Sequence, residues 1–423
     1  MLPNQGMSST PATATALGPL LAWAGFAIVL GLAPLLASGT LALSLISQMG
    51  IAIIVCLSYN LLLGQGGMLS FGHAVYSGVG AFLSIHTLAL VAHGWPLPVS
   101  LVPVLGGLAG LALALILGWV ATRHSATPFA MITLGMGELV WSAALMFPGW
   151  SGGESGVSGD RSVGAGPWGL TLGPPLQLYY LIAAYTLACT GLLYAFTRTP
   201  LGRLLNAVRD NPERVGFIGH DPHTVRYLAF AIAAFFAGVS GGLAALHFEV
   251  VTADVLSGQR SGAYLLFTVL GGTGFFVGPI IGAILMVLAF AVFSEWTRAW
   301  LLYLGLAFML MVMLAPGGLA SLLLPQRWHA LARRVRLRPW HTLALVLGWA
   351  LVLGAAAAVV EMAYQFQERA ALGDVVWFLG LALHSGAPRD WLAIALIGAC
   401  GAMVIAGASR RARARRPVPV APP

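Results

Sequence analysis

Residues 199–222 read TPLGRLLNAVRDNPERVGFIGHDP, a charged and partly amphipathic segment in an otherwise very apolar chain. Apolar runs at 178–196 and 225–246 flank this segment, and each is about the length that crosses a hydrocarbon layer of roughly 30 Å as a helix. Pro200 and Pro212 bracket a charged stretch that suits a short rigid helix. The segment therefore predicts a membrane protein with a short rigid docking helix, through which a partner could move the flanking helices.

The composition is that of a chain that crosses a membrane many times. Of 423 residues, 59% are hydrophobic and 8% are charged, and the mean hydropathy is +0.88, which excludes a water-soluble globular domain. About twelve apolar runs approach the roughly 20 residues that a transmembrane helix needs. We predict an all-α polytopic membrane protein with about 10–12 transmembrane helices, and a tail at residues 1–19.

Arginine supplies all 21 basic residues and predicts the orientation. Because basic residues favour the cytoplasmic side, threading the spans from a cytoplasmic N-terminus places three arginine blocks and the C-terminus there. The net charge of +8 then reflects orientation and contact with anionic lipid, and we expect no nucleic-acid partner. The three blocks are Arg198, Arg203, Arg209, Arg214 and Arg226; Arg327, Arg333, Arg334, Arg336 and Arg338; and Arg410, Arg411, Arg413, Arg415 and Arg416.

The sequence contains no constellation of catalytic residues. A Walker A loop needs a lysine to reach the nucleotide phosphates, and this chain has none. It also lacks the GxSxG, HExxH and paired CxxC motifs, and the three cysteines, Cys56, Cys189 and Cys400, have no metal-ligand spacing. We therefore expect no enzyme activity, metal or cofactor in this chain, so that any ATP and Mg²⁺ would be bound by partner subunits.

Two glycine-rich breaks interrupt the apolar sequence at 63–81, LGQGGMLSFGHAVYSGVGA, and 270–283, LGGTGFFVGPIIGA. Their similarity predicts two pseudo-repeated halves with glycine-broken helices. Transporters commonly hold polar ligands at such discontinuities in the middle of the membrane. Tight packing of small residues is the alternative explanation, especially for the second break, which has few polar side chains.

Polar residues crowd the first break and form the predicted lining of a solute path. They are Asn60, Gln65, Ser70, His73 and Tyr76. A lone histidine in a span is also common as a hydrogen-bonded packing residue, and that alternative stays open for His73. Glu138 is the carboxylate deepest in a predicted span, and it could act in gating or solute passage or simply bond a neighbouring helix.

Residues 148–167, PGWSGGESGVSGDRSVGAGP, follow the fifth predicted span and lie on the outer side in this threading. Such a loop can be a plug or a contact surface for an external protein. Glycine and serine alone specify little, so a plain flexible connector is equally consistent with the sequence.

The motifs together resemble the LivM type of permease from bacterial high-affinity branched-chain amino acid ABC importers. The resemblance extends in order over residues 41–324. It rests on GQGGMLSFGHAVYSGVGA, TPFAMITLGMGELV, SGGESGVSG, the segment from TPLGRLLNAVRDNPERVGFIGHDP to GGLAAL, LGGTGFFVGPIIGA and LAPGGLASLL.

The resemblance implies a permease domain at 20–324 that works in an assembly. Its expected partners are a LivH-like second permease, LivG- and LivF-like ATPase subunits, and a periplasmic solute-binding protein. It also implies that the cytoplasmic segment 198–224 couples to the ATPases, with Gly202, Arg203, Arg209, Asn211, Glu213 and Gly219 as the matching interface residues. The localisation implied is the bacterial inner membrane, and the solute is a branched-chain amino acid or a relative such as urea, a short amide or an aromatic acid.

Residues 325–423 depart from the family pattern. They contain a basic linker, two more apolar segments and an arginine-rich tail. This extension could be a lipid-facing hairpin, a docking site for another subunit or a part with no transport role. Within it, residues 375–383 could form a short interfacial helix.

A second class of function remains open from the residues alone. An ion- or proton-coupled secondary transporter needs titratable groups inside its bundle, and Glu138 and His73 are the candidates here.

Overall fold

The computed structural model describes residues 17–36, 39–162, 172–297, 299–315, 317–323, 339–367, 375–378, 381–384 and 386–414. Most of the predicted tail at 1–19, the basic linker at 325–338 and the last arginines of the C-terminal tail lie outside these residues. The chain divides into two compact units, Met1–Leu288 and Ala289–Pro423, which are described separately. The predicted domain boundary between 324 and 325 falls in a segment that is not described and stays a prediction.

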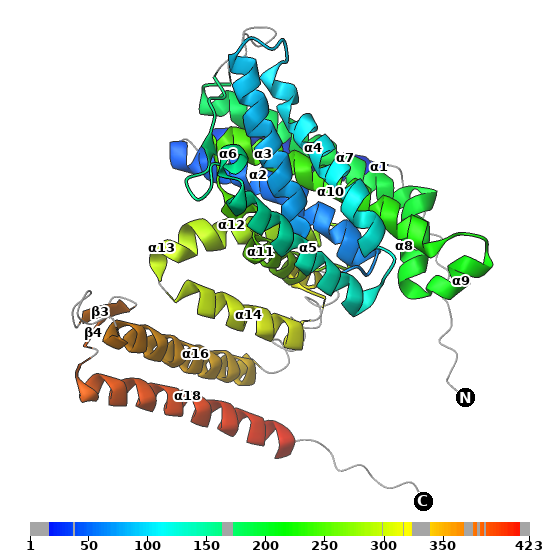
Figure 1. The fold of residues 1–423 in the computed structure, drawn as a ribbon. Helices are drawn as coiled ribbons and strands as arrows, with labels where there is room; N and C mark the ends of the chain where they lie inside the picture. Colours follow the sequence, from blue (N-terminus) through cyan, green and yellow to red (C-terminus); the bar gives the residue numbers. More distant parts are fainter. Residues whose placement is uncertain are drawn as a thin grey trace, which may run out of the picture. The chain divides into compact units, whose positions relative to one another are not determined.

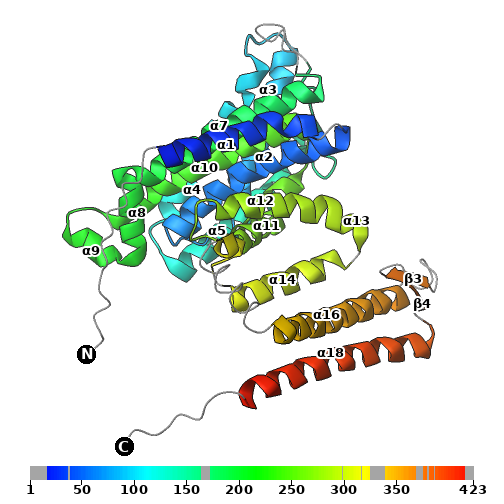
Figure 2. The same cartoon turned by 180° about the vertical axis from the view of Figure 1, so that it is seen from behind.

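Unit 1 is a bundle of helices around α10, which packs against α2, α3 and α4 (Figure 1). α1 and α2 pack against α7, and α11 packs against α12 and α2 (Figure 2). In chain order the elements are α1 (Leu17–Leu36), α2 (Thr40–Asn60), η1 (Leu61–Gln65), α3 (His73–Ala92), η2 (Val99–Leu101), α4 (Val102–Ala121), α5 (Ala126–Met146), α6 (Pro148–Ser151), β1 (Val157–Ser158), α7 (Pro175–Arg198), α8 (Pro200–Asp210), α9 (Pro212–Phe217), α10 (Pro222–Phe248), β2 (Val250–Val251), η4 (Ala253–Leu256), α11 (Gly258–Gly271) and α12 (Gly278–Leu288).

Glycines allow the central helices to touch backbone to backbone. A Cβ built on Gly241 of α10 would lie 1.7 Å from the carbonyl oxygen of Ser77 in α3. One built on Gly238 would lie 2.4 Å from the carbonyl oxygen of Gly106 in α4. Because lipid tails are as apolar as leucine, helices in a bilayer associate largely through such close van der Waals contact. The core of unit 1 therefore depends on the absence of side chains at these crossings.

The two ends of unit 1 differ in structure. We call residues 199–221, which include α8 and α9, the elbow, and the end where they lie the elbow end (Figure 1). The opposite end, the loop end, carries an antiparallel pair in which Val157 of β1 lies opposite Val251 of β2. This pairing anchors part of the glycine- and serine-rich loop predicted at 148–167, so the described part of the loop is not a plain flexible connector.

Unit 2 is built around an antiparallel helical hairpin of α16 and α18. A Cβ on Gly401 of α18 would lie 2.8 Å from the carbonyl oxygen of Gly348 in α16, and Ala355, Met362 and Ile394 form part of the buried core. The elements are η5 (Ala289–Phe293), α13 (Ser294–Trp296), α14 (Trp300–Leu314), η6 (Leu319–Leu323), α16 (Pro339–Gln367), β3 (Val375–Phe378), β4 (Leu381–His384) and α18 (Pro388–Ala414).

The interfacial helix considered for residues 375–383 is wrong. β3 and β4 pair there as antiparallel strands, with Val375 opposite His384. The segment begins VVWF, and β-branched and aromatic side chains favour strands over helices.

The all-α polytopic fold class is confirmed. Among the described residues, nine helices are long and apolar enough to cross a membrane, and the two shorter apolar helices are Trp23–Leu35 and Trp300–Met313. α11, at 14 residues, is too short to cross alone, and α12 folds back against it, with a Cβ on Gly282 only 2.0 Å from Phe267 O. The internal repeat of two halves stays a prediction.

Candidate functional site

The first glycine-rich break contains a short non-helical segment, residues 66–72, held in place by polar contacts. α2 passes into the π-helical turn η1, residues 66–72 leave the helix, and α3 begins at His73. Inside a membrane every backbone polar group needs a partner, and side chains from three helices supply several here. Tyr59 donates to Ser70 O at 2.6 Å, Phe71 N to Thr133 Oγ1 at 3.1 Å, and Ala74 N to Ser261 Oγ at 3.0 Å.

Four of the predicted path residues lie buried around this segment, namely Asn60, Ser70, His73 and Tyr76. His73 Nε2 is 2.8 Å from Ser58 Oγ, and its ring lies edge-on to Tyr59. Among the described residues, Asn60 Oδ1, Ser70 Oγ and His73 Nδ1 are buried without a hydrogen-bond partner. Unpaired polar atoms in the interior are costly, so these three could accept water or a polar solute. Their role in a path stays a prediction.

Glu138 lies on α5 and approaches the start of α11. A Cβ built on Gly258 would be 2.6 Å from Glu138 Oε1. The first N–H groups of a helix carry partial positive charge, so a carboxylate is favourable there. One residue earlier, Gly137 of α5 packs against Gly72 of the first break. α5 therefore contacts both the break and, through Glu138, the α11 N-terminus, which leaves both gating and a structural role open.

The elbow is a pair of short helices with a side-chain cap at each start. Thr199 accepts from Gly202 N ahead of α8, Asn211 accepts from Arg214 N ahead of α9, and Asp221 accepts from two backbone N–H groups ahead of α10. A proline follows each cap at the first helical position, where its missing N–H costs nothing. Hydrogen bonds from Thr224 and from the backbone lower the pKa of the Asp221 carboxyl, so this cap stays ionised near neutral pH.

The six residues matched to the family's coupling pattern have different positions in the elbow. Gly202 is buried, and a Cβ there would lie 2.4 Å from Phe196 O, so α8 can fold back closely on α7. Gly219 adopts φ +85°, which favours glycine. Asn211 is the α9 cap, whereas Arg203 and Glu213 are exposed and Arg209 reaches η1.

The elbow carries an exposed apolar tip, Phe217 and Ile218, that the sequence analysis did not predict. Phe217 is 89% exposed and Ile218 is 67% exposed. Two adjacent large apolar side chains at the end of a polar segment form a typical docking feature. The pair FI within the charged segment RVGFIGHD was the signal that could have identified it.

The elbow is joined directly to the first break. Arg209 Nη1 donates to Gly64 O at 2.5 Å, and Asn206 Nδ2 donates to Gln65 Oε1 at 2.8 Å. Gly64 is also close to the second break, because a Cβ there would lie 2.6 Å from Thr273 O. Gln65, predicted to line a path, thus faces α8, and the two breaks meet beside the elbow.

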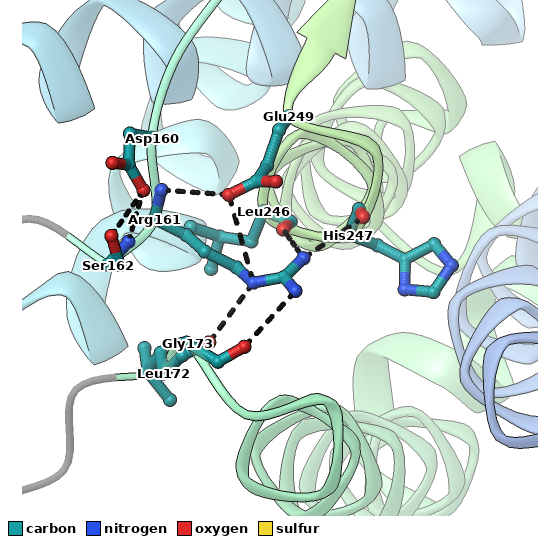
Figure 3. Close-up of polar contacts among 8 residues, drawn as sticks. All are labelled: Asp160, Arg161, Ser162, Leu172, Gly173, Leu246, His247 and Glu249. Carbon is teal, nitrogen blue, oxygen red and sulfur yellow. Dashed lines mark hydrogen bonds and ion pairs between the residues drawn. The ribbon is translucent and has the colours of Figure 1, made fainter. Parts of the chain in front are cut away.

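At the loop end, Arg161 ties the outer loop to the C-terminus of α10 (Figure 3). Its guanidinium donates to Leu246 O at 3.2 Å and His247 O at 3.3 Å, and an ion pair of 3.8 Å links it to Glu249. The last carbonyls of a helix lack internal partners and carry partial negative charge, so a cation there is stabilising. The sequence did not single out Arg161, since nothing in its local pattern pairs it with residues 246–249.

No metal site is evident in the part of the chain that the structure describes, because no group of three or more His, Cys, Asp or Glu side chains could hold an ion there. Cys56 and Cys189 are buried free thiols and Cys400 is exposed.

Comparison with known proteins agrees with the helical architecture. Residues 41–316 match the family described as "Branched-chain amino acid transport system / permease component". The chain is 29% identical over 297 residues to the high-affinity branched-chain amino acid transport system permease protein LivM of Escherichia coli strain K12, covering 65% of this chain and 69% of that protein. The LivM of Salmonella typhimurium strain LT2 matches equally, and no solved structure matches the chain.

The relatives are permease proteins of transport systems and not enzymes, which confirms the resemblance read from the motifs. The matched region spans most of unit 1 and stops before the α16–α18 hairpin. This multi-pass membrane protein belongs to the family of permease components of branched-chain amino acid transport systems.

Proposed function

We propose that this chain is the transmembrane permease subunit of an ATP-driven importer for branched-chain amino acids or a related small polar solute. It forms half of the translocation path, and a LivH-like permease forms the other half. One observation carries the proposal: the elbow exposes an apolar tip at Phe217 and Ile218 and also bonds the first break through Arg209. The name of the two LivM relatives supports the class of solute.

The elbow lies on the cytoplasmic side of the bacterial inner membrane in this proposal. Five arginines lie in or beside the elbow, compared with Arg161 at the loop end. This asymmetry agrees with the positive-inside rule and makes both termini cytoplasmic. A periplasmic solute-binding protein would then deliver the solute to the loop end.

Energy comes from partner subunits. The chain has no lysine and so no P-loop, and LivG- and LivF-like ATPases therefore bind the ATP and Mg²⁺. These ATPases dock at the elbow. Closure of the two ATPases displaces the tip, and α8 moves with it. Asn206 and Arg209 transmit that displacement to Gln65 and Gly64, where the two breaks meet. Alternating access follows if this pull favours one of two arrangements of the breaks.

Replacement of Phe217 with aspartate tests the docking of the ATPases. We expect ATPase co-purification to fall at least about tenfold, because a truncated apolar anchor typically loses 2 kcal/mol or more and here a charge replaces it. Glu213→Arg, which reverses an exposed charge on the same helix, is a second variant. Phe147→Asp is the matched control, because Phe147 is 62% exposed after α5 at the loop end. Unchanged assembly of both elbow variants would contradict the proposal.

Uptake into membrane vesicles separates the ATP-driven importer from a proton-coupled transporter. Vesicles that contain the full assembly are expected to accumulate leucine only with internal ATP. Accumulation driven by an imposed proton gradient without ATP would instead favour the secondary transporter, with Glu138 and His73 as its titratable groups.

A further inference from the structure

A cavity of about 270 Å³ lies at the loop end of unit 1, between the starts of α2 and α7 and the end of α10. Ser44, Ser47, Arg161 and His247 supply much of its polar lining, and Leu43 and Leu178 supply much of its apolar lining. The cavity is far from the first break and the elbow along α2, and no step described above uses it.

The cationic group in the lining is held rigidly. Backbone carbonyl groups of Leu172, Gly173, Leu246 and His247 accept from the Arg161 guanidinium at 3.0–3.4 Å (Figure 3). A guanidinium has five N–H groups, so one on Nη2 has no partner among the described residues. The Arg161 side chain is 15% exposed and is only partly neutralised by Glu249 at 3.8 Å.

One ring nitrogen of the histidine in the lining has no hydrogen-bond partner among the described residues. The His247 imidazole points away from the Arg161 guanidinium, and its Nε2 lies 3.1 Å from Ser44 Oγ (Figure 3). Gln48 donates to that hydroxyl oxygen at 3.2 Å, which leaves the Ser44 proton available for Nε2. When Ser44 donates to Nε2, the neutral ring carries its proton on Nδ1. Nδ1 is buried and has no hydrogen-bond partner in the described chain.

The surrounding backbone adds to the positive potential. α2 starts at Thr40 and α7 at Pro175, and both residues line the cavity. The first N–H groups of a helix attract anions, so two helix starts and a guanidinium favour negative charge in one place. The His247 imidazole adds an N–H when Ser44 donates to its Nε2. Leu43 and Leu178 give the same cavity an aliphatic wall.

We propose that this cavity binds a small organic acid with an aliphatic side chain, its carboxylate directed to Arg161 and His247. An aliphatic amino acid has this chemistry. The cavity would then be a receiving site at the entrance of the permease. This role as an entrance rests on the proposed function, whereas binding itself does not.

Binding of leucine to the purified full-length chain in phosphatidylcholine nanodiscs tests the site without ATPases or a binding protein. Saturable leucine binding is expected, with 4-methylpentanoate competing and leucinamide, which lacks the carboxylate, competing at least about tenfold less well. His247→Phe keeps the size of the ring and is expected to weaken binding about tenfold, and Ser44→Ala, which frees the imidazole to change its tautomer, by a smaller factor. His86→Phe is the matched control, because His86 also lies near the loop end but bonds Trp150 O outside the cavity.

The outcomes are distinct. No saturable leucine binding by the wild type, or binding unchanged in both His247→Phe and Ser44→Ala, would overturn the site. Loss of leucine binding when phosphatidylglycerol replaces part of the lipid would assign the cavity to a lipid phosphate instead. If leucine binds as expected but ATP-driven uptake is absent from the full assembly, the proposed function fails and the binding site stands.

Discussion

Replacing Gly241 with valine is expected to prevent unit 1 from folding. Gly241 lies where α10 crosses α3, and a Cβ there would be 1.7 Å from Ser77 O and 3.0 Å from Ala81 N. The obstacle is backbone, so no side-chain rotation relieves it. Overpacking a core costs about 1–3 kcal/mol where side chains can adjust, and we expect a larger cost here because the two helices must separate. The yield of monodisperse protein should fall at least tenfold, as measured by size-exclusion chromatography in detergent.

Gly191→Val is the matched control for this substitution. Gly191 lies in the middle of α7, another candidate span, and apart from the neighbouring backbone of α7 no described atom lies within 4 Å of a Cβ built on it. The control should be recovered at close to the wild-type yield. Normal recovery of Gly241→Val would show that α3 and α10 do not cross as closely as described.

Replacing Arg209 with alanine is expected to uncouple ATP hydrolysis from uptake. The substitution removes the 2.5 Å bond to Gly64 O but leaves the apolar tip at Phe217 in place. The exposed ion pair of Arg209 with Asp210 contributes little, so the main loss is the contact with the break. In the proposed assembly, uptake of leucine should fall at least about tenfold, while co-purified ATPase and its basal hydrolysis rate stay near wild type.

Arg198→Ala serves as the control for the loss of a cationic side chain beside the elbow. Arg198 donates to the Tyr194 hydroxyl of α7, and no contact among the described residues joins it to the first break. A second variant, Asn206→Leu, removes the bond to Gln65 and should reproduce the uncoupled behaviour. Full uptake in Arg209→Ala and Asn206→Leu would contradict transmission through α8.

The positions of the transmembrane helices could be predicted from local sequence. The predicted apolar runs at 178–196 and 225–246 lie within α7 and α10, whose ends extend two to three residues beyond them. This works because the thickness of the hydrocarbon layer sets a length of apolar sequence, whatever the helix packs against. The short helical structure of the elbow is also a local property, because Thr199, Asn211 and Asp221 cap helices through contacts within three residues.

The candidate site was only partly predictable. The polar cluster around the first break includes four buried residues, as expected of groups that need partners, but Gln65 faces Asn206, 141 positions away. The sequence drew attention to His73 and not to His247, although both have a buried unpaired ring nitrogen. His247 becomes part of a candidate site only because Arg161, 86 positions away in the sequence, bonds its backbone carbonyl.

The sequence by itself determined the membrane class, the approximate spans, the elbow and the family motifs, because each depends on residues within one helix or one turn. Tertiary structure decided which glycines let helices cross, that Gly64 joins the elbow to the second break, and that Arg161 and His247 share a cavity. These features depend on the approach of segments far apart in the chain. Such an approach is set by the packing of several helices at once, and local periodicity does not encode it.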